Sequence, residues 1–336
     1  MLTRKSIGLA EQISALAITD SFTKRFAQSF LTEALKQDHM KAFLFNPSNQ
    51  FKDKINVRAI ALLILPLFLL VGCGEEIQSQ VEQAKAKAAD EKLGDKFTIP
   101  NLNLEMIWVE PGTFTMGQHG VVGPEHNVTL SQGFYLGKYE VTQAQYEAVM
   151  TGNNDNHNPT PSNFAGNPNH PVERVNFDAV LKFIEILNQK EADQLPLGWS
   201  FTLPTDAEWE YACRAGTRSS FSWGEEVGPN DANWNHGNDA NKTVDVGSYY
   251  PNAWGFYDMH GNLWEWTADS YTKLSDEPQT DPFFDGDTGK KVVRGGAYDA
   301  PSGNLRSSIR GRHNPAQAFT NTGFRLSLKY TNTPPL

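Results

Sequence analysis

The spacing of apolar and polar positions predicts three helices and several short strands, all after residue 100. The helices are expected over "VTQAQYEAVM" (141–150), "NFDAVLKFIEILNQKE" (176–191) and "LPTDAEWEYACRAG" (203–216). In the middle segment, apolar residues recur at helical spacing and form one face. The other two open with a capping box, Thr142 with Gln145 and Thr205 with Glu208, and Gly216 is expected to end the last helix.

The strand candidates are short apolar runs set between glycines, prolines and asparagines. They are "MIWVE" (106–110), "FTMG" (114–117), "GFYLGKYEV" (133–141), "KVVRGG" (291–296) and "GFRLSLKY" (323–330). Long helices do not alternate regularly with these strands, which argues against a doubly wound sheet. The pattern therefore predicts a single α+β domain over residues 101–330, with much irregular backbone.

Near the amino-terminal end, an apolar run over residues 59–71 follows a basic stretch at 52–58 and is interrupted by Pro66. It is too short to span a membrane as a helix, but it has the length of the apolar part of a signal peptide. The run leads into "LVGC", which resembles the bacterial lipobox, where the cysteine takes a diacylglyceryl group. Residues 40–72 are therefore predicted to be a lipoprotein signal peptide and Cys73 the lipidated residue; a cleaved signal with a chance cysteine is the alternative.

The segments on either side of this signal are interpreted from their composition. Met40 is a second candidate start, so residues 1–39 are interpreted as a doubtful extension without a function. Residues 73–100 include a stretch rich in Ala, Glu, Lys and Gln without an apolar stripe, and are predicted to be a polar tether. Such an anchored protein is expected in the bacterial cell envelope, in a Gram-negative cell at the outer membrane, facing the periplasm or the outside.

The charge balance and the cysteine content argue against two classes of function. With 29 basic and 39 acidic residues, the formal net charge is −10, which argues against a nucleic-acid partner. An acidic balance is typical of a soluble protein and is also compatible with cation binding. Besides Cys73 there is one cysteine, Cys213, expected to be a small buried side chain, so the cysteines cannot build a thiolate metal site.

After residue 100, eight motifs follow one another in order. They are "MIWVEPGTFTMG" (106–117), "YLGKYEVTQAQY" (135–146), "HPVERVNFDAVLKF" (170–183), "FTLPTDAEWEYACRAGT" (201–217), "FSWG" (221–224), "PNAWGFYDMHGNLWEWTAD" (251–269), "VVRGG" (292–296) and "GFRLSL" (323–328). In content and order they resemble the formylglycine-generating enzyme, or sulfatase-modifying factor, family, whose fold is similar to that of C-type lectins. The resemblance covers about residues 101 to 330 and implies this fold.

The chemistry of that family depends on two cysteines that this chain lacks. The resemblance implies oxidation of a substrate cysteine by O₂, with Cu(I) held by two thiolates shortly after an Arg-Gly-Gly motif. Here the motif is 294–296, the first cysteine position corresponds to Ala300, and the second falls within 301–304. Because neither position holds a cysteine, we expect no copper and a noncatalytic role.

The resemblance also implies structural calcium. The implied ligands are the carboxylates of Asp258 and Glu265 with the carbonyls of Gly261 and Leu263 for one ion, and Asn233, the Trp234 carbonyl and Asp239 for a second. Oxygen donors gathered at a turn suit a hard cation such as Ca²⁺. A hydrogen-bonded cluster without metal is the alternative.

Residues 295–315 combine glycines and arginines with an assorted set of residues between them. Arg306, Arg310 and Arg325 are interpreted as a buried frame, and the intervening residues as an outward-facing surface that binds a protein or small-molecule ligand. The predicted ligand-binding residues are Tyr298, Asp299, Ala300, Ser302, Gly303, Asn304, Ile309, Gly311, His313, Asn314 and Phe319. The layout resembles the variable proteins of diversity-generating retroelements, in which adenine-directed mutagenesis rewrites a binding surface, here 298–321; drift in an inactive enzyme is the alternative.

Three functions follow from these observations. The leading hypothesis is a noncatalytic, lipid-anchored ligand-binding protein. The second is a periplasmic enzyme with repurposed chemistry that uses neither copper nor cysteine but Tyr, His or Asp side chains near 298–313, with or without a new metal; Asp299 and His313 are the residues whose mutation tests it. The third is an envelope component that assembles with sister proteins.

Overall fold

The computed structural model describes residues 93–196, 198–236 and 241–331. The chain divides into two compact units, Met1–Gly74 and Glu75–Leu336, and all described residues belong to the second. The predicted signal peptide, Cys73 and most of the tether therefore lie outside the described residues, as does Asp239. Within the described part, no helix is both long enough and apolar enough to cross a membrane.

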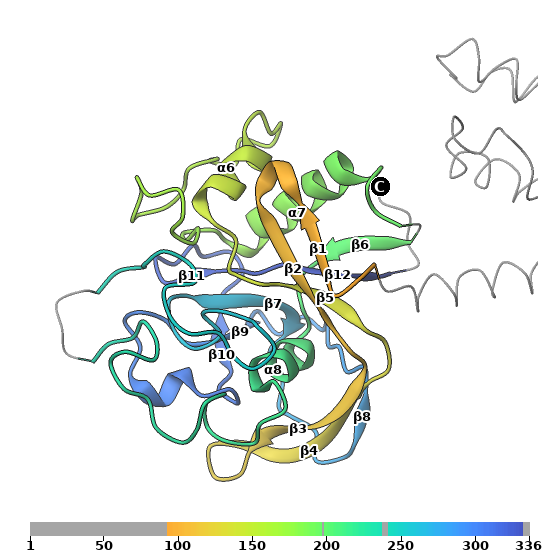
Figure 1. Cartoon of the computed structure of the whole chain (residues 1–336), viewed down its shortest axis with the longest axis vertical. Coiled ribbons are helices and arrows are strands. Elements are labelled where there is room, and N and C mark those ends of the chain that lie inside the picture. Colours follow the sequence, from red (N-terminus) through yellow and green to blue (C-terminus); the bar gives the residue numbers. More distant parts are fainter. Residues whose placement is uncertain (1–92, 197, 237–240, 332–336) are drawn as a thin grey trace, which may run out of the picture. The chain divides into compact units, whose positions relative to one another are not determined.

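The largest sheet has five strands, all antiparallel, in the spatial order β1-β2-β5-β12-β6 (Figure 1). The strands are β1 (Lys96–Ile99), β2 (Leu104–Val109), β5 (Phe134–Gly137), β12 (Ser327–Tyr330) and β6 (Trp199–Thr202). Strand β12 lies between β5 and β6, so the carboxyl-terminal end of the domain joins segments far apart in sequence.

Two smaller sheets complete the β structure. A four-stranded sheet has the order β10-β9-β7-β11, and a three-stranded sheet has the order β3-β4-β8. Their strands are β10 (Gly311–His313), β9 (Lys291–Arg294), β7 (Trp264–Ser270), β11 (Thr322–Gly323), β3 (Gly112–Gln118), β4 (Val122–Leu130) and β8 (Gln279–Thr280). The pairs β7–β11 and β4–β8 are parallel, and the other pairs in these two sheets are antiparallel.

The three predicted helices are confirmed. The helical segments are α6 (Gln143–Met150), α7 (Phe177–Glu191), α8 (Asp206–Arg214) and two 3₁₀ turns, η1 (Pro100–Leu102) and η2 (Ser302–Leu305). Both capping boxes form as predicted, on Thr142 and Thr205, and Asn176 caps α7. After α8 the chain turns into the left-handed region at Ala215 (φ 45°) and Gly216 (φ +88°), which ends the helix near the predicted residue.

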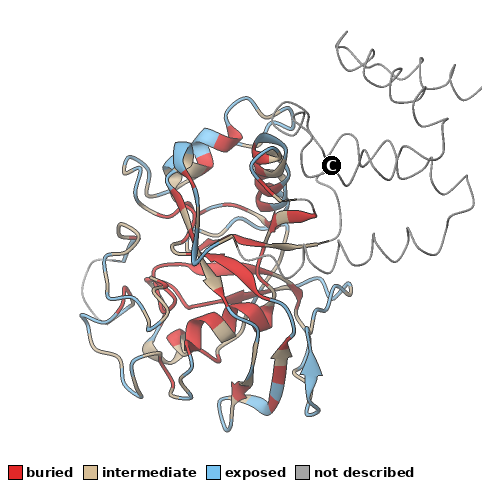
Figure 2. Cartoon of the chain, turned by 45° about the vertical axis from the view of Figure 1, so that its right-hand side comes forward, coloured by how far each residue is buried: buried red, intermediate tan, exposed pale blue. Residues whose placement is uncertain are grey.

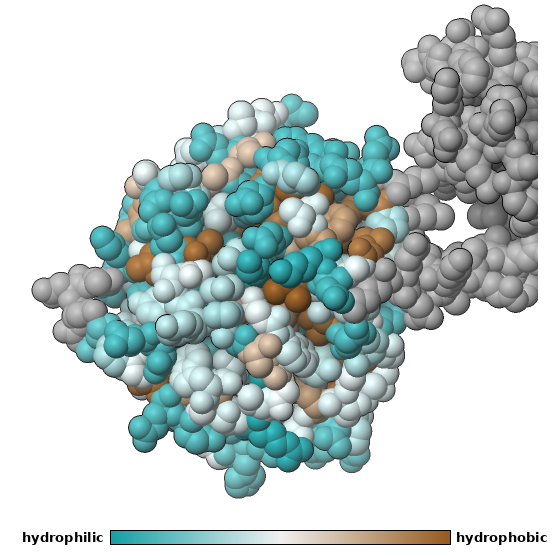
Figure 3. Space-filling view, viewed as in Figure 1, coloured by the Kyte–Doolittle hydropathy of each residue, from teal (hydrophilic) through white to brown (hydrophobic). Residues whose placement is uncertain are grey.

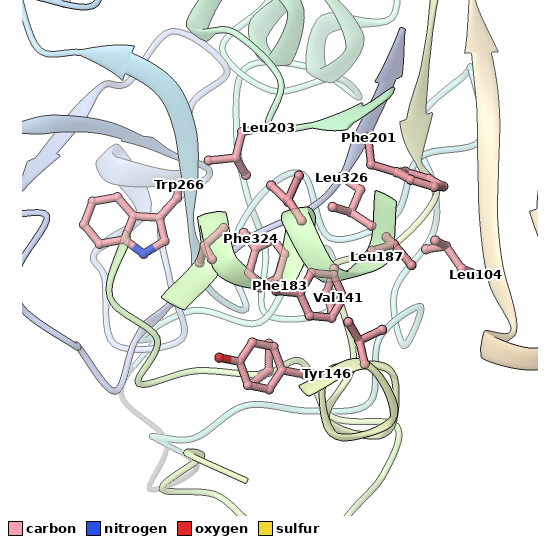
Figure 4. Close-up of a cluster of buried hydrophobic side chains, with 14 of the residues drawn as sticks. Leu104, Val141, Tyr146, Phe183, Leu187, Phe201, Leu203, Trp266, Phe324 and Leu326 are labelled. Carbon is pink, nitrogen blue, oxygen red and sulfur yellow. The ribbon is translucent and has the colours of Figure 1, made fainter. Parts of the chain in front are cut away.

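Two apolar clusters hold these elements together. One joins the five-stranded sheet to α6 and α7, and Figure 4 shows Tyr146 and Phe183 within it, near Phe324. The rings of Tyr146 and Phe183 stack at 5.4 Å. The second cluster surrounds α8, whose Trp209 is fully buried and which packs against β3, β7 and β9. Figure 2 shows that the strands at the centre of the domain are mostly buried, whereas many loops are exposed. Both residues of β8 are exposed as well.

The strand predictions hold for β2, β3, β5 and β9, whereas β4, β6, β8 and β10 were not predicted. Three further points need correction. The run 323–330 is broken into β11 and β12. The segment "WEWTADS" was not expected to be a strand, yet it forms β7; most of its residues are buried, so the polar–apolar alternation that marks a strand is missing. The domain also begins earlier than residue 101, because β1 lies within the predicted tether and pairs with β2.

Candidate functional site

A buried ion-pair network fixes the stretch that was predicted to bind a ligand. Arg294, at the end of β9, is fully buried; its Nε donates to Asp206 Oδ1 at 2.5 Å and its Nη2 to Glu210 Oε2 at 2.9 Å. Arg310 Nε donates to the other Asp206 oxygen at 2.7 Å. Both carboxylates lie on α8, so this helix is tied to the two ends of the segment between Arg294 and Arg310.

The same arginine also holds the backbone of that segment. Arg294 Nη1 donates to the carbonyl oxygens of Ser307 and Ile309, at 3.0 and 3.1 Å. At Gly296 (φ +77°), a Cβ would lie 2.9 Å from the carbonyl oxygen of Asn304, so only glycine permits this close turn. The frame therefore fixes the backbone of this loop at Gly296, Ser307 and Ile309.

A second buried ion pair joins β7 to the segment between β11 and β12. Arg325 Nε and Nη2 donate to the two oxygens of Glu265, each at 2.6 Å, and Trp209 Nε1 donates to Glu265 Oε2 at 2.7 Å. Arg325 and Glu265 are both fully buried. The prediction of a buried frame is thus confirmed for Arg310 and Arg325. It is wrong for Arg306, which is only half-buried and whose Nε is buried without a hydrogen-bond partner.

Two of the predicted ligand-binding residues do not face outward. Tyr298 and Ala300 are each only 5% exposed. Tyr298 packs edge-on against Phe164, with ring centroids 5.4 Å apart, and Ala300 belongs to a small apolar cluster with Phe221 and Leu305. Both positions are part of the support of the loop. The other nine are partly exposed: Asp299, Ser302, Gly303, Asn304, Ile309, Gly311, His313, Asn314 and Phe319.

Several of these partly exposed residues converge at the turn before β11. Asn321 Nδ2 donates to both carboxylate oxygens of Asp299, at 3.0 and 3.1 Å. His313 Nδ1 lies 3.1 Å from Thr322 Oγ1, and its ring contacts Phe319 with centroids 4.4 Å apart. Burial lowers the pKa of His313 to about 4, so the ring is neutral at physiological pH. The result is a mixed polar and aromatic patch built from 299, 313 and 319–322.

Sequence reasoning missed three members of this patch and its support. Phe164, Asn321 and Thr322 were not among the predicted residues, yet each contacts one that was. Asn321 and Thr322 directly precede the "GFRLSL" motif, which offered a signal; Phe164 lies in an irregular loop far away in sequence and offered none.

The cysteine in the described part of the chain is not placed for thiolate chemistry. Cys213 is fully buried on α8, and burial raises the pKa of its thiol to about 12. Its sulfur lies 3.6 Å from Nε2 of His260, a ring whose pKa burial lowers to about 4 and whose Nδ1 donates to the Leu305 carbonyl. The position corresponding to the first family cysteine, Ala300, is in a separate cluster with Leu305.

The residues implied as ligands of the first calcium ion fit that role only in part. Asp258 is buried, its Oδ2 accepts from the Gly247 N–H at 2.7 Å, and its Oδ1 has no partner, which is the state expected of a ligand atom. Burial raises the pKa of this carboxyl to about 6. Glu265 does not fit, because Arg325 and Trp209 already occupy both of its oxygens.

A third acidic group, not predicted, adjoins this place. Glu140 is buried; its Oε1 accepts from the Leu263 N–H at 3.0 Å and its Oε2 from Asn262 Nδ2 at 2.6 Å. Burial, together with the nearby carboxylates of Asp258 and Glu265, raises its pKa well above the ordinary range. Among the described residues, however, His, Cys, Asp and Glu form no group of three or more that could hold a metal as they stand.

The implied second site lies against the first. Gly261 (φ +96°) approaches Asn233 so closely that a Cβ would lie 2.3 Å from its carbonyl oxygen. Asn233 Nδ2 donates to the Lys242 carbonyl at 3.0 Å and to Asn262 Oδ1 at 3.2 Å, and Trp234 Nε1 donates to the Gly228 carbonyl. Hydrogen bonds within the protein therefore hold these side chains.

The fold and the frame define the class of protein: a formylglycine-generating-enzyme domain of the C-type-lectin-like type. A family model described as "Sulfatase-modifying factor enzyme 1-like domain" matches residues 95–329, and the chain belongs to this family. It is 32% identical over 184 residues to a formylglycine-generating enzyme of Streptomyces coelicolor, covering 49% of this chain and 55% of that protein. The chain thus spans about half the length of this relative.

Two further relatives carry names that indicate other roles. The chain is 32% identical over 209 residues to a chaperone protein, LppX, of Paenibacillus barcinonensis, covering 48% of this chain and 70% of that protein. Among solved structures it is similar to Treponema denticola variable protein 1, with a TM-score of 0.61, 25% identity, and coverage of 71% of this chain and 100% of the other. The resemblance to a variable protein, expected from the sequence, is confirmed at the level of structure.

Proposed function

We propose that this chain is a noncatalytic ligand-binding protein of the bacterial envelope, held by a lipid on Cys73. The observation that carries the proposal is the buried Arg294 network, which fixes the loop backbone while partly exposed positions such as Ser302, Gly303 and Asn304 lie outside the core. A frame of this kind supports recognition because loops on a rigid scaffold can change their contacts without losing the fold. The similarity to a chaperone protein and to a variable protein supports a binding role.

The proposal predicts that binding and folding are separable. In a library that shuffles only Ser302, Gly303, Asn304 and Asn314, most variants are expected to keep a cooperative unfolding transition within a few °C of the parent, because these side chains belong to none of the apolar clusters. Gly311 stays fixed because a Cβ there would lie 2.6 Å from Val293 Cγ2, and Ile309 and Phe319 stay fixed because they pack against the core. A protein ligand selected for binding to one variant should bind the other folded variants with different affinities, measured by biolayer interferometry. A matched library at Tyr298 and Ala300 is expected to lose the transition. Unfolding of the first library would contradict the proposal.

We further propose that residues 298–321 are the target of a diversity-generating retroelement. The support is the variable-protein similarity and the separation of frame from exposed positions. A reverse transcriptase gene and a near-identical template repeat beside this gene are expected. Their absence would leave an inactive enzyme whose exposed positions have drifted.

An enzyme with repurposed chemistry is the second candidate, favoured by the meeting of Asp299, Asn321, His313 and Thr322 in one patch. In this candidate the neutral imidazole of His313 acts as the general base. Turnover that is lost in His313→Gln would support this candidate. Conversion of a sulfatase-type cysteine peptide to the aldehyde would overturn the noncatalytic proposal.

We also propose one structural Ca²⁺, bound by Asp258 and the carbonyls of Gly261 and Leu263. The unpartnered Asp258 Oδ1 supports it. Adding calcium is expected to raise the melting temperature, since an ion that binds only the folded state stabilises it by mass action. Asp258→Asn should abolish the response, whereas Asp276→Asn, at an exposed carboxylate elsewhere, should retain it. An equal response from both variants would rule out this site.

A further inference from the structure

Residues of the β3–β4 hairpin and of the carboxyl-terminal end of α8 line an open site that lies away from the proposed ligand-binding loop. These elements are in the lower part of Figure 1. The site is a cleft of about 380 Å³, and none of its lining residues belongs to 298–321. This volume is within the range of small-ligand sites, about 300–1,000 Å³. Six of its lining residues bear on ligand binding: Phe114, Thr115, Asn127, Tyr211, Arg218 and Trp254.

One wall of the cleft is aromatic. The ring centroids of Phe114 and Tyr211 are 5.2 Å apart, and those of Tyr211 and Trp254 are 4.9 Å apart at 77°. All three rings are half-buried. The tyrosine is held in place because Gly112 leaves room for it: a Cβ there would lie 2.2 Å from the Tyr211 hydroxyl. The rings are thus packed at their backs and partly open at the surface.

The polar lining forms an oriented chain of hydrogen bonds. Arg218 Nη2 donates to Thr115 Oγ1 at 2.8 Å, and Thr115 Oγ1 donates to Asn127 Oδ1 at 3.5 Å. Arg218 and Asn127 are exposed, so their remaining N–H groups are available to a ligand. The lining contains no carboxylate, and Arg214, its other cation, is engaged by Glu210. The positive charge of this cleft is therefore supplied by the exposed guanidinium of Arg218.

We propose that the cleft binds an acidic saccharide. The apolar face of a pyranose ring packs on an aromatic ring, its hydroxyls pair with amide and hydroxyl groups such as those of Asn127 and Thr115, and a carboxylate is bound by the guanidinium fork of Arg218. Figure 3 shows hydrophilic and intermediate residues with small separate apolar patches on the face in view. This site is independent of the loop that carries the proposed function.

The test is isothermal titration calorimetry on the full-length chain with two matched probes. Cellobiouronic acid carries a carboxylate where cellobiose carries a hydroxymethyl group. The acid is expected to bind with a Kd of about 1 mM or tighter. Arg218→Gln should weaken it about tenfold and leave cellobiose unchanged, because only the charged contact is lost. Trp254→Ala should weaken both probes, and Lys96→Gln, which removes a positive charge from β1, should change neither.

Three results would overturn the proposal of an acid-saccharide site. Absence of saturable binding by the acid, or an equal loss in Lys96→Gln and Arg218→Gln, would show that no specific acid-binding site exists. If Trp254→Ala fails to fold, Asn127→Ala replaces it, since that side chain is exposed and makes only the 3.5 Å contact. A short acidic peptide that binds in the cleft while the disaccharide does not would assign the site to another class of ligand.

Discussion

Replacing Arg294 with methionine is expected to lower the free energy of unfolding by about 3–5 kcal/mol, the usual cost of leaving a buried charge without its partner. The side chain is fully buried and binds Asp206, Glu210 and two loop carbonyls. Methionine fills much of the volume but offers no donor, so both carboxylates and both carbonyls lose a bond. Urea unfolding followed by tryptophan fluorescence measures the loss.

Two controls separate the network from a general effect of charge. Arg312→Met, at an exposed position in β10, is expected to change stability by no more than about 0.5 kcal/mol. Arg310→Met should fall between the two, because Asp206 keeps its bond to Arg294. A loss below about 1 kcal/mol in Arg294→Met would mean that the frame does not depend on this arginine.

The sequence predicted best those features that are specified locally. The capping boxes at Thr142 and Thr205 need only residues three apart, and both formed. The buried roles of Arg310 and Cys213 were also predicted correctly. Cys213 lies within one of the ordered motifs, on a predicted helix. The family fold followed from the order of motifs, and the match over 95–329 confirms it.

The features that were missed depend on partners distant in sequence. Arg306 was assigned to the frame, yet Arg294 and not Arg306 binds both carboxylates on α8, which lie more than 80 positions earlier in the sequence. Tyr298 has the character of an exposed recognition residue, yet it is buried and packs against Phe164, which is far away in sequence. Strand β7 was hidden because it is buried on both faces and has no alternating pattern.

These corrections sharpen the division between scaffold and surface. The residues that are hard to recognise from sequence, Tyr298 and Ala300, are supporting positions beneath the loop. The residues that remain exposed lie above a network whose stability does not come from them. Variation of the surface and preservation of the fold are therefore physically compatible in this domain, which is the condition that the proposed function requires.

The second large effect is expected at Arg325, the cation that stands among three buried carboxylates. Arg325→Met should cost about 3–5 kcal/mol, because Glu265 loses both bonds to the guanidinium while Glu140 and Asp258 remain close by. The same substitution frees the oxygens of Glu265 that Arg325 now occupies. We therefore expect the variant, more than the parent, to be stabilised by calcium, which would replace the lost positive charge.

Urea unfolding of Arg325→Met with and without calcium measures this directly. At a hundredfold excess of calcium over its Kd, the recovery should reach about 2.7 kcal/mol. The double variant Arg325→Met with Glu265→Gln should recover part of the stability without calcium and gain little from it, because the freed charge is gone. If calcium stabilises the single variant no more than the parent, the three carboxylates do not form a cation site, and the arginine serves only to neutralise Glu265.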